Sequence, residues 1–260
     1  MEPWRTAIAT SDATNIWIRG HEIAALMRGA TFTDIVVLLH LGRMATPAER
    51  RLLDAILIGV ADHGAGAPSC AAARLAASGN RQSISAAVAA GILAIGDEHG
   101  GAGSNCMDLI REGLALAREQ GIGPDEAARR LVARAIEAKR RLPGLGHRVH
   151  THDPRVDTLF ELAKTEGVAA DGDAFMRALE SEARTRIKPL PMNVDGALAA
   201  VLHDMGFPPA AGKFIFIIGR VAGLTAEVAE EYARERPMRI KFEVEYDGVP
   251  PVEDHAPKRT

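Results

Sequence analysis

Signals that begin and end helices recur along almost the whole chain, and they constrain its fold more than any other feature. In Thr46-Pro47-Ala48-Glu49, a capping threonine, a proline at the first helical position and a glutamate at the third predict a helix through about Ala61. Similar signals predict helices near residues 69–78 (Ser69 cap, Gly79 stop), 83–95, 104–120 (Ser104 cap, Gly121 stop), 124–141, from Asp153-Pro154 to just before Gly167, 173–187, 195–205, 209–219 and 221–235. The sequence therefore predicts an all-α fold.

Strand signals are few. Residues 16–18 and the alternating residues 240–244 are the segments that look like strands. Aromatic residues make up only 4% of the chain, whereas alanine and glycine are abundant. This composition favours closely packed helices over an aromatic-rich β-sandwich. The alanine-rich helices at 69–95 are equally consistent with ordinary core and with contact between two copies.

Charge and cysteine content exclude several classes of function. With 31 basic and 34 acidic residues interspersed, the net charge of -3 creates no global attraction to nucleic acid or to an anionic membrane. Cys70 and Cys106 form neither a disulfide framework nor a paired zinc motif. With no long apolar segment and no secretory leader pattern, we expect a cytoplasmic protein.

Histidine, arginine, aspartate and glycine concentrate in four segments between predicted helices, where functional residues are commonly placed. These segments are Ala61-Asp62-His63-Gly64, Asp97-Glu98-His99-Gly100-Gly101-Ala102-Gly103, Pro143-Gly144-Leu145-Gly146-His147-Arg148 and Pro191-Met192-Asn193-Val194-Asp195-Gly196. Each contains groups suited to acid–base chemistry or to anion binding.

Several interpretations of these groups stay open. Asp195 precedes an apolar run, so it lies in the first turn of a helix as either a cap or a catalytic carboxylate. His99, among glycines, could donate to an oxyanion, although no strand or G-x-G-x-x-G pattern accompanies it. His147 lies in a glycine turn near two further histidines, but their spacing does not place them on one helical face. A metal site is therefore not favoured there.

Three arginines could each form a bidentate pair with a carboxylate: Arg155 just inside a helix start, Arg220 after Gly219, and Arg236 before Pro237. Solvated positions explain Arg155 and Arg236 equally well. Arg220 differs, because apolar residues on both sides predict that it is buried. A buried arginine needs an anionic partner from the protein or from a ligand.

Taken together and in order, these segments resemble the citrate synthase superfamily, and within it the compact branch of citryl-CoA lyase and the lyase module of ATP citrate lyase. The resemblance extends over nearly the whole chain, from Arg19-Gly20-His21 through Phe216-Ile217-Ile218-Gly219-Arg220 to Arg236-Pro237. It implies one domain over residues 1–260, with a large and a small helical subdomain, the small one at roughly 97–190.

The resemblance also implies roles for individual residues. Asp195 would transfer a proton at the methyl carbon of the acetyl-CoA moiety, His99 would hydrogen-bond the thioester oxygen, and His147 would serve the hydroxyl or carbonyl oxygen of the dicarboxylate half. The implied substrate-binding residues are His63, Arg148, Arg155, Arg220 and Arg236, the last of which a neighbouring subunit could supply. The implied coenzyme A contacts are Pro143, Gly144, Leu145, Gly146, Arg186 and Lys188.

The implied activity is cleavage of citryl-CoA to acetyl-CoA and oxaloacetate by a homodimer or homotetramer. A coenzyme A thioester would be the substrate, with no resident cofactor or metal, and a separate citryl-CoA synthetase would act upstream. Three alternatives stay open: condensation in the synthase direction, which His99 favours, cleavage of a related ester such as citramalyl-CoA, and binding of coenzyme A without catalysis.

Overall fold

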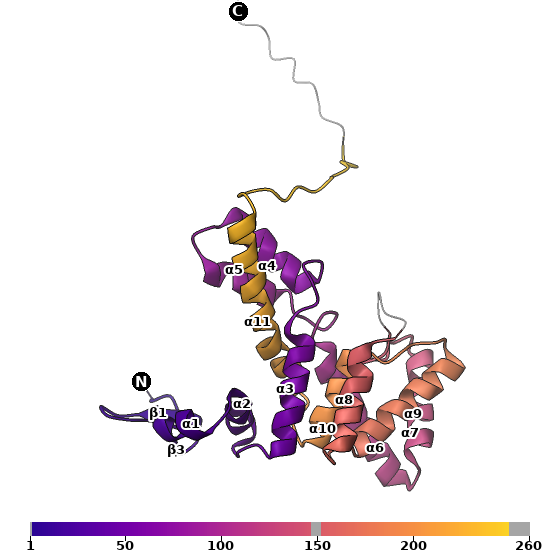
Figure 1. The fold of residues 1–260 in the computed structure, drawn as a ribbon. Coiled ribbons are helices and arrows are strands. Elements are labelled where there is room, and N and C mark those ends of the chain that lie inside the picture. Colours follow the sequence, from indigo (N-terminus) through magenta and orange to yellow (C-terminus); the bar gives the residue numbers. More distant parts are fainter. Residues whose placement is uncertain (1, 147–151, 250–260) are drawn as a thin grey trace, which may run out of the picture.

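The computed structural model describes residues 2–146 and 152–249. Within these ranges the chain is almost entirely helical, which confirms the all-α prediction (Figure 1). The helices are α1 (Ile23–Gly29), α2 (Phe32–Leu41), α3 (Pro47–Ala61), α4 (Pro68–Gly79), α5 (Ile84–Leu93), α6 (Ala102–Gln120), α7 (Pro124–Glu137), α8 (Pro154–Thr165), α9 (Asp171–Arg186), α10 (Val194–Asp204) and α11 (Ala211–Arg234). No described helix is both long and apolar enough to cross a bilayer.

The strongest predicted helix boundaries are confirmed. At the start of α3, the Thr46 hydroxyl accepts the Glu49 N–H (3.2 Å), and the Glu49 carboxylate accepts the Thr46 N–H (2.8 Å). Gly121 ends α6 in the left-handed conformation, with φ of 63°. Asp153 caps α8 by accepting the Arg155 N–H. These ends depend on neighbours in the sequence, so local signals were sufficient to predict them.

Three predicted boundaries are wrong. Ser69 does not cap α4, which begins at Pro68 behind Ala67, and Ser69 is buried in its first turn. Likewise Gly101, and not Ser104, occupies the N-cap of α6. The helix predicted to reach residue 141 ends at Glu137, because Lys139 adopts a left-handed conformation with φ of 51°.

The two helices predicted at 209–219 and 221–235 form the single helix α11. Gly219 is required by close packing, and it does not break the helix. A Cβ atom at Gly219 would lie 2.5 Å from the Val60 side chain and 2.9 Å from the carbonyl oxygen of Leu57, both on α3. The glycine therefore lets α3 and α11 approach closely.

The small sheet also differs from the prediction. The segment Ile16–Ile18 is strand β2, as expected, but it pairs antiparallel with two strands that were not predicted, β1 (Ala9–Ser11) and β3 (His21–Glu22). The strand predicted at 240–244 is wrong for the described chain. Residues 241–249 are exposed and extended without a neighbouring strand to take their hydrogen bonds.

Helix α11 connects two hydrophobic cores. Its first half packs in the larger core with residues from α3 and α6–α10, and its second half packs with α4 and α5 around a smaller core (Figure 1). The smaller core is built largely from alanines, namely Ala67, Ala73, Ala77 and Ala87, with Cys70, Leu224 and Val228. Arg220 lies on α11 between the segments that enter the two cores.

Candidate active site

Arg220 is buried, as its apolar neighbours predict, with only 2% of its surface exposed. Its Nε donates to the carbonyl oxygen of Val60 at the end of α3 (2.9 Å), and its Nη1 donates to the Ser69 hydroxyl (3.0 Å). The guanidinium carbon lies 5.0 Å from the centre of the Phe216 ring. A guanidinium has five N–H donors, so these two contacts leave three N–H groups of Arg220 for other acceptors.

Ser69 connects Arg220 to His99. The Ser69 N–H donates to His99 Nε2 (3.2 Å), and the Ser69 hydroxyl lies 2.9 Å from the same nitrogen. Because a backbone N–H can only donate, Nε2 acts as an acceptor, and a neutral His99 carries its proton on Nδ1. Ser69 thereby sets the tautomer in which Nδ1 is the donor.

Replacing Ser69 by alanine is expected to lower kcat/KM about tenfold, because it removes the hydroxyl that joins Arg220 to His99 and leaves a buried donor without its acceptor. The measurement is steady-state kinetics with the coenzyme A thioester that the family resemblance implies. Ser78→Ala is the matched control, since Ser78 is also buried on α4 but its hydroxyl has no partner among the described residues. Equal effects of the two substitutions would contradict a role for Ser69.

Asp195 lies in the first turn of α10, and its side chain is not the cap. The Asn193 side chain accepts the N–H groups of Asp195 (3.0 Å) and Gly196 (3.2 Å), which leaves the Asp195 carboxyl available for other interactions. Atom Oδ1 of Asp195 is buried and has no hydrogen-bond partner among the described residues. Of the two interpretations of Asp195, the cap is therefore wrong.

Burial raises the pKa of Asp195 to about 6. The positive charges of Arg155 and Arg220 act to lower this pKa, whereas the negative charge of Asp153 acts to raise it. Near neutral pH both the acid and the carboxylate are therefore populated, as a group that both gives and takes protons requires.

The loop containing Gly144 and Gly146 holds the segment before Asp195. The Asn193 N–H donates to the Gly144 carbonyl (3.0 Å), and the Asn193 side-chain amide donates to the Gly146 carbonyl (2.7 Å). Gly144 has φ of 81°, and a Cβ atom there would lie 2.8 Å from the Cα atom of Gly196. Glycine is thus needed at this position for both its conformation and its size.

Arg155 lies at the start of α8 and is paired within the chain. Its Nη2 and Nε contact the two carboxylate oxygens of the buried Asp153 (2.7 and 2.9 Å), and its Nη1 donates to the carbonyl oxygen of Gly59 on α3 (3.1 Å). The pair thereby connects α8 to α3. A substrate carboxylate would have to share this guanidinium with Asp153.

Other predicted residues lie apart from this group in the described chain. Arg186 is exposed and pairs with Glu182 (3.3 Å), and Lys188 is exposed next to it. Arg236 is exposed beyond the end of α11. Because α11 is continuous from Arg220 to Arg234, its rise of 1.5 Å per residue separates those two residues by about 21 Å. Arg236 therefore cannot join Arg220 on one substrate within the same chain.

The remaining predicted residues are His63, which is exposed in the segment after α3, and the pair His147 and Arg148, which lie outside the described residues. Pro143 and Leu145 are half-buried, and Leu145 forms a bridge to Met192. The structure thus brings together His99 and Arg220 through Ser69. It also places Asp195 where the positive charges of Arg155 and Arg220 act on its pKa.

Sequence reasoning missed the roles of Ser69 and Asp153 in the site, because both carry helix-start signals. Serine and aspartate before or within a first helical turn are normally interpreted as caps. Asp153 is indeed a cap, but it also holds Arg155. For Ser69 the sequence contains no signal of these contacts, since its partners His99 and Arg220 are 30 and 151 positions away.

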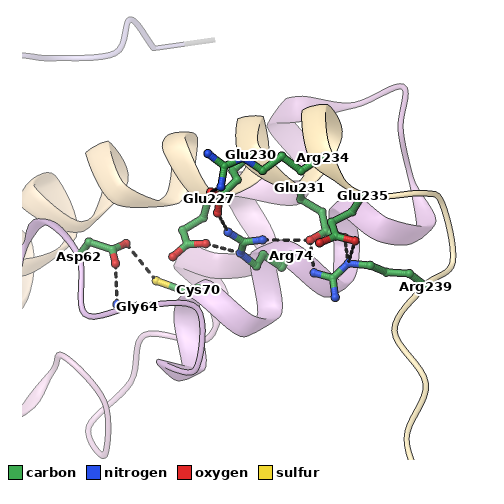
Figure 2. A network of polar contacts seen from close by, with 10 residues as sticks. All are labelled: Asp62, Gly64, Cys70, Arg74, Glu227, Glu230, Glu231, Arg234, Glu235 and Arg239. Atoms are coloured by element: carbon green, nitrogen blue, oxygen red, sulfur yellow. Dashed lines mark hydrogen bonds and ion pairs between the residues drawn. The ribbon is translucent and has the colours of Figure 1, made fainter.

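The described residues include one group with metal-ligand chemistry, formed by Asp62, Cys70 and Glu227, whose ligand atoms lie within 4.8 Å of one another (Figure 2). Arg74 pairs with Glu227, and the Cys70 thiol donates to Asp62 (3.4 Å). Burial raises the pKa of the Cys70 thiol, with Asp62 adding to the effect. We assign no metal to this group, because its polar atoms already form hydrogen bonds or ion pairs with one another, with Arg74 and with the Gly64 N–H.

The fold and this geometry define a helical protein that gathers a buried carboxyl group, a histidine of set tautomer and buried or partly buried arginines. Residues 41–241 match the family model of the citrate synthase C-terminal domain, and the chain belongs to the citrate synthase family. Citrate synthase 2 of Bacillus subtilis (strain 168) is 30% identical over 211 residues, which cover 80% of this chain and 53% of that protein. The chain spans about half the length of the curated relatives it matches.

Solved structures show the same fold. A citryl-CoA lyase from Hydrogenobacter thermophilus is 36% identical with a TM-score of 0.87, and the match covers 97% of each chain. ATP citrate lyase from Methanothrix soehngenii, solved with citrate and coenzyme A, matches 95% of this chain and 43% of its own at 18% identity and a TM-score of 0.75. A citrate synthase from Thermotoga maritima gives a TM-score of 0.61 at 18% identity. The last two likenesses concern the fold alone.

Proposed function

We propose that this protein is a carbon–carbon lyase that cleaves citryl-CoA to acetyl-CoA and oxaloacetate. The observation that carries the proposal is the buried Asp195 carboxyl, whose pKa of about 6 allows it to hold a proton for a carbon atom near neutral pH. The 36% identity with a citryl-CoA lyase over 97% of both chains supports the choice of substrate.

In this proposal His147 accepts the proton of the substrate hydroxyl group as that oxygen becomes a carbonyl. The electron pair of the breaking C–C bond moves to the carbon next to the thioester, forming an enolate, and the Nδ1–H of His99 donates to its oxygen. Asp195, in its acid form, then gives its proton to that carbon, which yields the acetyl group. Condensation is the same sequence reversed and begins with Asp195 as the carboxylate.

The dicarboxylate half of the substrate needs cationic partners. We assign its carboxylates to the three remaining donors of Arg220, to Arg155 after it exchanges part of its contact with Asp153, and to His63 and Arg148. Arginines in a partly desolvated site bind carboxylates in a fixed orientation, which aligns the bond to be broken.

The substrate is proposed to be a coenzyme A thioester, without a permanently bound cofactor. The backbone of residues 143–146 would contact the adenine, and the exposed cations Arg186 and Lys188 would face the phosphates. The proposed small subdomain at roughly 97–190 contains α6–α9 and this loop. Formation of citryl-CoA from citrate requires an energy input, for which we propose a separate synthetase.

A homodimer or homotetramer would complete the site. Helices α4 and α5 expose small or apolar side chains, among them Ala71, Ala86, Ala89 and Leu93, and such a surface permits close contact with a second copy. Because Arg236 lies too far from Arg220 to act in its own chain, we propose that it binds a substrate carboxylate in the neighbouring subunit. Cys70 and Cys106 are buried and form no disulfide, which is consistent with a reducing compartment such as the cytoplasm.

Product analysis with purified protein tests the activity. We expect citryl-CoA to disappear with release of acetyl-CoA and oxaloacetate in equal amounts, and the same protein to form citryl-CoA from those two products. Citramalyl-CoA serves as the comparison substrate, with expected kcat/KM at least about 10-fold lower because it lacks one carboxylate. Turnover of citramalyl-CoA without turnover of citryl-CoA would refute the proposed substrate. Binding of coenzyme A with no turnover of either ester would refute the enzymatic function.

A further inference from the structure

A buried ion cluster joins the end of α11 to α4 and to the segment that follows α11 (Figure 2). Glu231 is completely buried, and its carboxylate binds Arg74 of α4 (3.1 Å) and Arg239 (2.9 and 2.5 Å). Arg74 also contacts Glu227 and Glu230. Glu231 is therefore the point at which cations from two separate segments converge.

Hydrogen bonds to the backbone also hold the end of α11 and the residues that follow it. Arg81, just after α4, donates to the carbonyl oxygens of Glu231 (2.9 Å) and Glu235 (2.6 Å). The N–H of Met238 donates to the carbonyl oxygen of Ser78 (2.9 Å). Met238 adopts a left-handed conformation with φ of 56°, which is uncommon for a residue other than glycine. Three contacts thus hold the chain from 235 to 239: those of the Glu235 carbonyl with Arg81, of the Met238 N–H with Ser78, and of Arg239 with Glu231.

Packing of the hydrophobic core does not require residues 235–239 to be held in one conformation. From α11, the smaller core receives the buried Val228 and then the partly buried Tyr232, and the chain beyond Arg239 is largely exposed. Burying carboxylates and guanidinium groups contributes little net stability compared with apolar residues of similar size. These contacts involve residues on both sides of Arg236 in the sequence, while Arg236 itself is exposed and takes no part in them. The cluster therefore fixes the position of residues 235–239 more than it stabilises the fold.

We propose that Arg74, Arg81, Glu231 and Arg239 form a clamp that holds Arg236 in the position from which it binds the substrate of a second copy. This inference rests on the proposed function, because it requires Arg236 to bind a substrate carboxylate. The clamp residues are positioning residues that act through Arg236. The clamp stays charged in the neutral range: burial acts to raise the pKa of Glu231, but Arg239 and Arg74 hold it below its usual value.

Kinetics of single and double substitutions test the clamp. Arg236→Ala is expected to lower kcat/KM for citryl-CoA about 30-fold or more, since it leaves a substrate carboxylate without its partner. Arg239→Gln is expected to lower it about tenfold, mainly by raising KM, and Arg239→Lys should restore part of the loss. In the Arg236→Ala background, Arg239→Gln should have no further effect. The matched control is Arg130→Gln, because Arg130 pairs with Glu126 (2.9 Å) within α7 and neither residue belongs to the ion cluster.

Arg81→Gln provides a second test, because it removes two backbone anchors without leaving the Glu231 carboxylate unpaired. In the wild-type background Arg81→Gln should raise KM, and in the Arg236→Ala background it should have no further effect. If Arg239→Gln and Arg81→Gln lower kcat/KM equally in both backgrounds, or not at all, the clamp proposal is wrong while the function of Arg236 stands.

Mixed oligomers of Asp195→Asn and Arg236→Ala chains separate the clamp from the proposed function. If Arg236 acts on a second copy, the mixed oligomer contains intact sites and regains activity that neither variant has alone. No recovery, or full activity of Arg236→Ala, would overturn the assignment of Arg236 and, with it, the clamp.

Discussion

Replacing Asp195 by asparagine is expected to lower kcat by at least about 100-fold in both directions, because the amide can neither give nor take the proton at the carbon atom. The same substitution should make the folded protein more stable at pH 8. The folded pKa of about 6 lies above the ordinary value of 3.8, so ionisation of Asp195 opposes folding. This destabilisation is absent below about pH 4, grows as the pH rises through 6, and reaches about 3 kcal/mol at most.

The measurement is the melting temperature of wild type and Asp195→Asn at pH 8 and at pH 4, beside single-turnover kinetics. We expect a higher melting temperature for the variant at pH 8, by several degrees, and no difference at pH 4. Asp204→Asn, at the other end of α10, is the control. Asp204 accepts the N–H groups of Ala170, Gly172 and Asp173, so its replacement should reduce stability and spare activity. An active Asp195→Asn variant would remove Asp195 from the mechanism.

Replacing Arg220 by lysine is expected to lower kcat/KM about 100-fold or more. Lysine preserves the positive charge, but its single ammonium group cannot bind the Val60 carbonyl, the Ser69 hydroxyl and a substrate carboxylate together. Loss of the Ser69 contact should also disturb His99, so both KM and kcat should change.

Steady-state kinetics and far-ultraviolet circular dichroism check this expectation, the latter to establish that the variant folds. Arg134→Lys is the control, because Arg134 is exposed and pairs with Glu112 (2.6 Å) outside the site. A twofold or smaller change in kcat/KM for Arg220→Lys would show that the guanidinium is not used for substrate.

How much of the site is predictable from sequence depends on the distance between interacting residues. The Asn193-Val194-Asp195-Gly196 segment predicts both a helix start and a candidate acid. In the structure Asn193 caps the helix, and Asp195 is the candidate acid. Apolar neighbours were sufficient to predict the burial of Arg220. The contact of Arg220 with Ser69 and the tautomer of His99 were not predictable, because both depend on Ser69, which a local signal marks as a cap.

The sequence by itself determined the all-helical class, most helix boundaries and the candidate chemistry, because caps, stops and apolar spacing act between residues a few positions apart. Tertiary structure decided the continuity of α11, where Gly219 packs against α3. It also decided the raised pKa of Asp195, the contact of Arg155 with the Gly59 carbonyl on α3, and the separation of Arg236 from Arg220. These features arise from burial and from contacts between residues distant in the chain, which local sequence patterns do not encode.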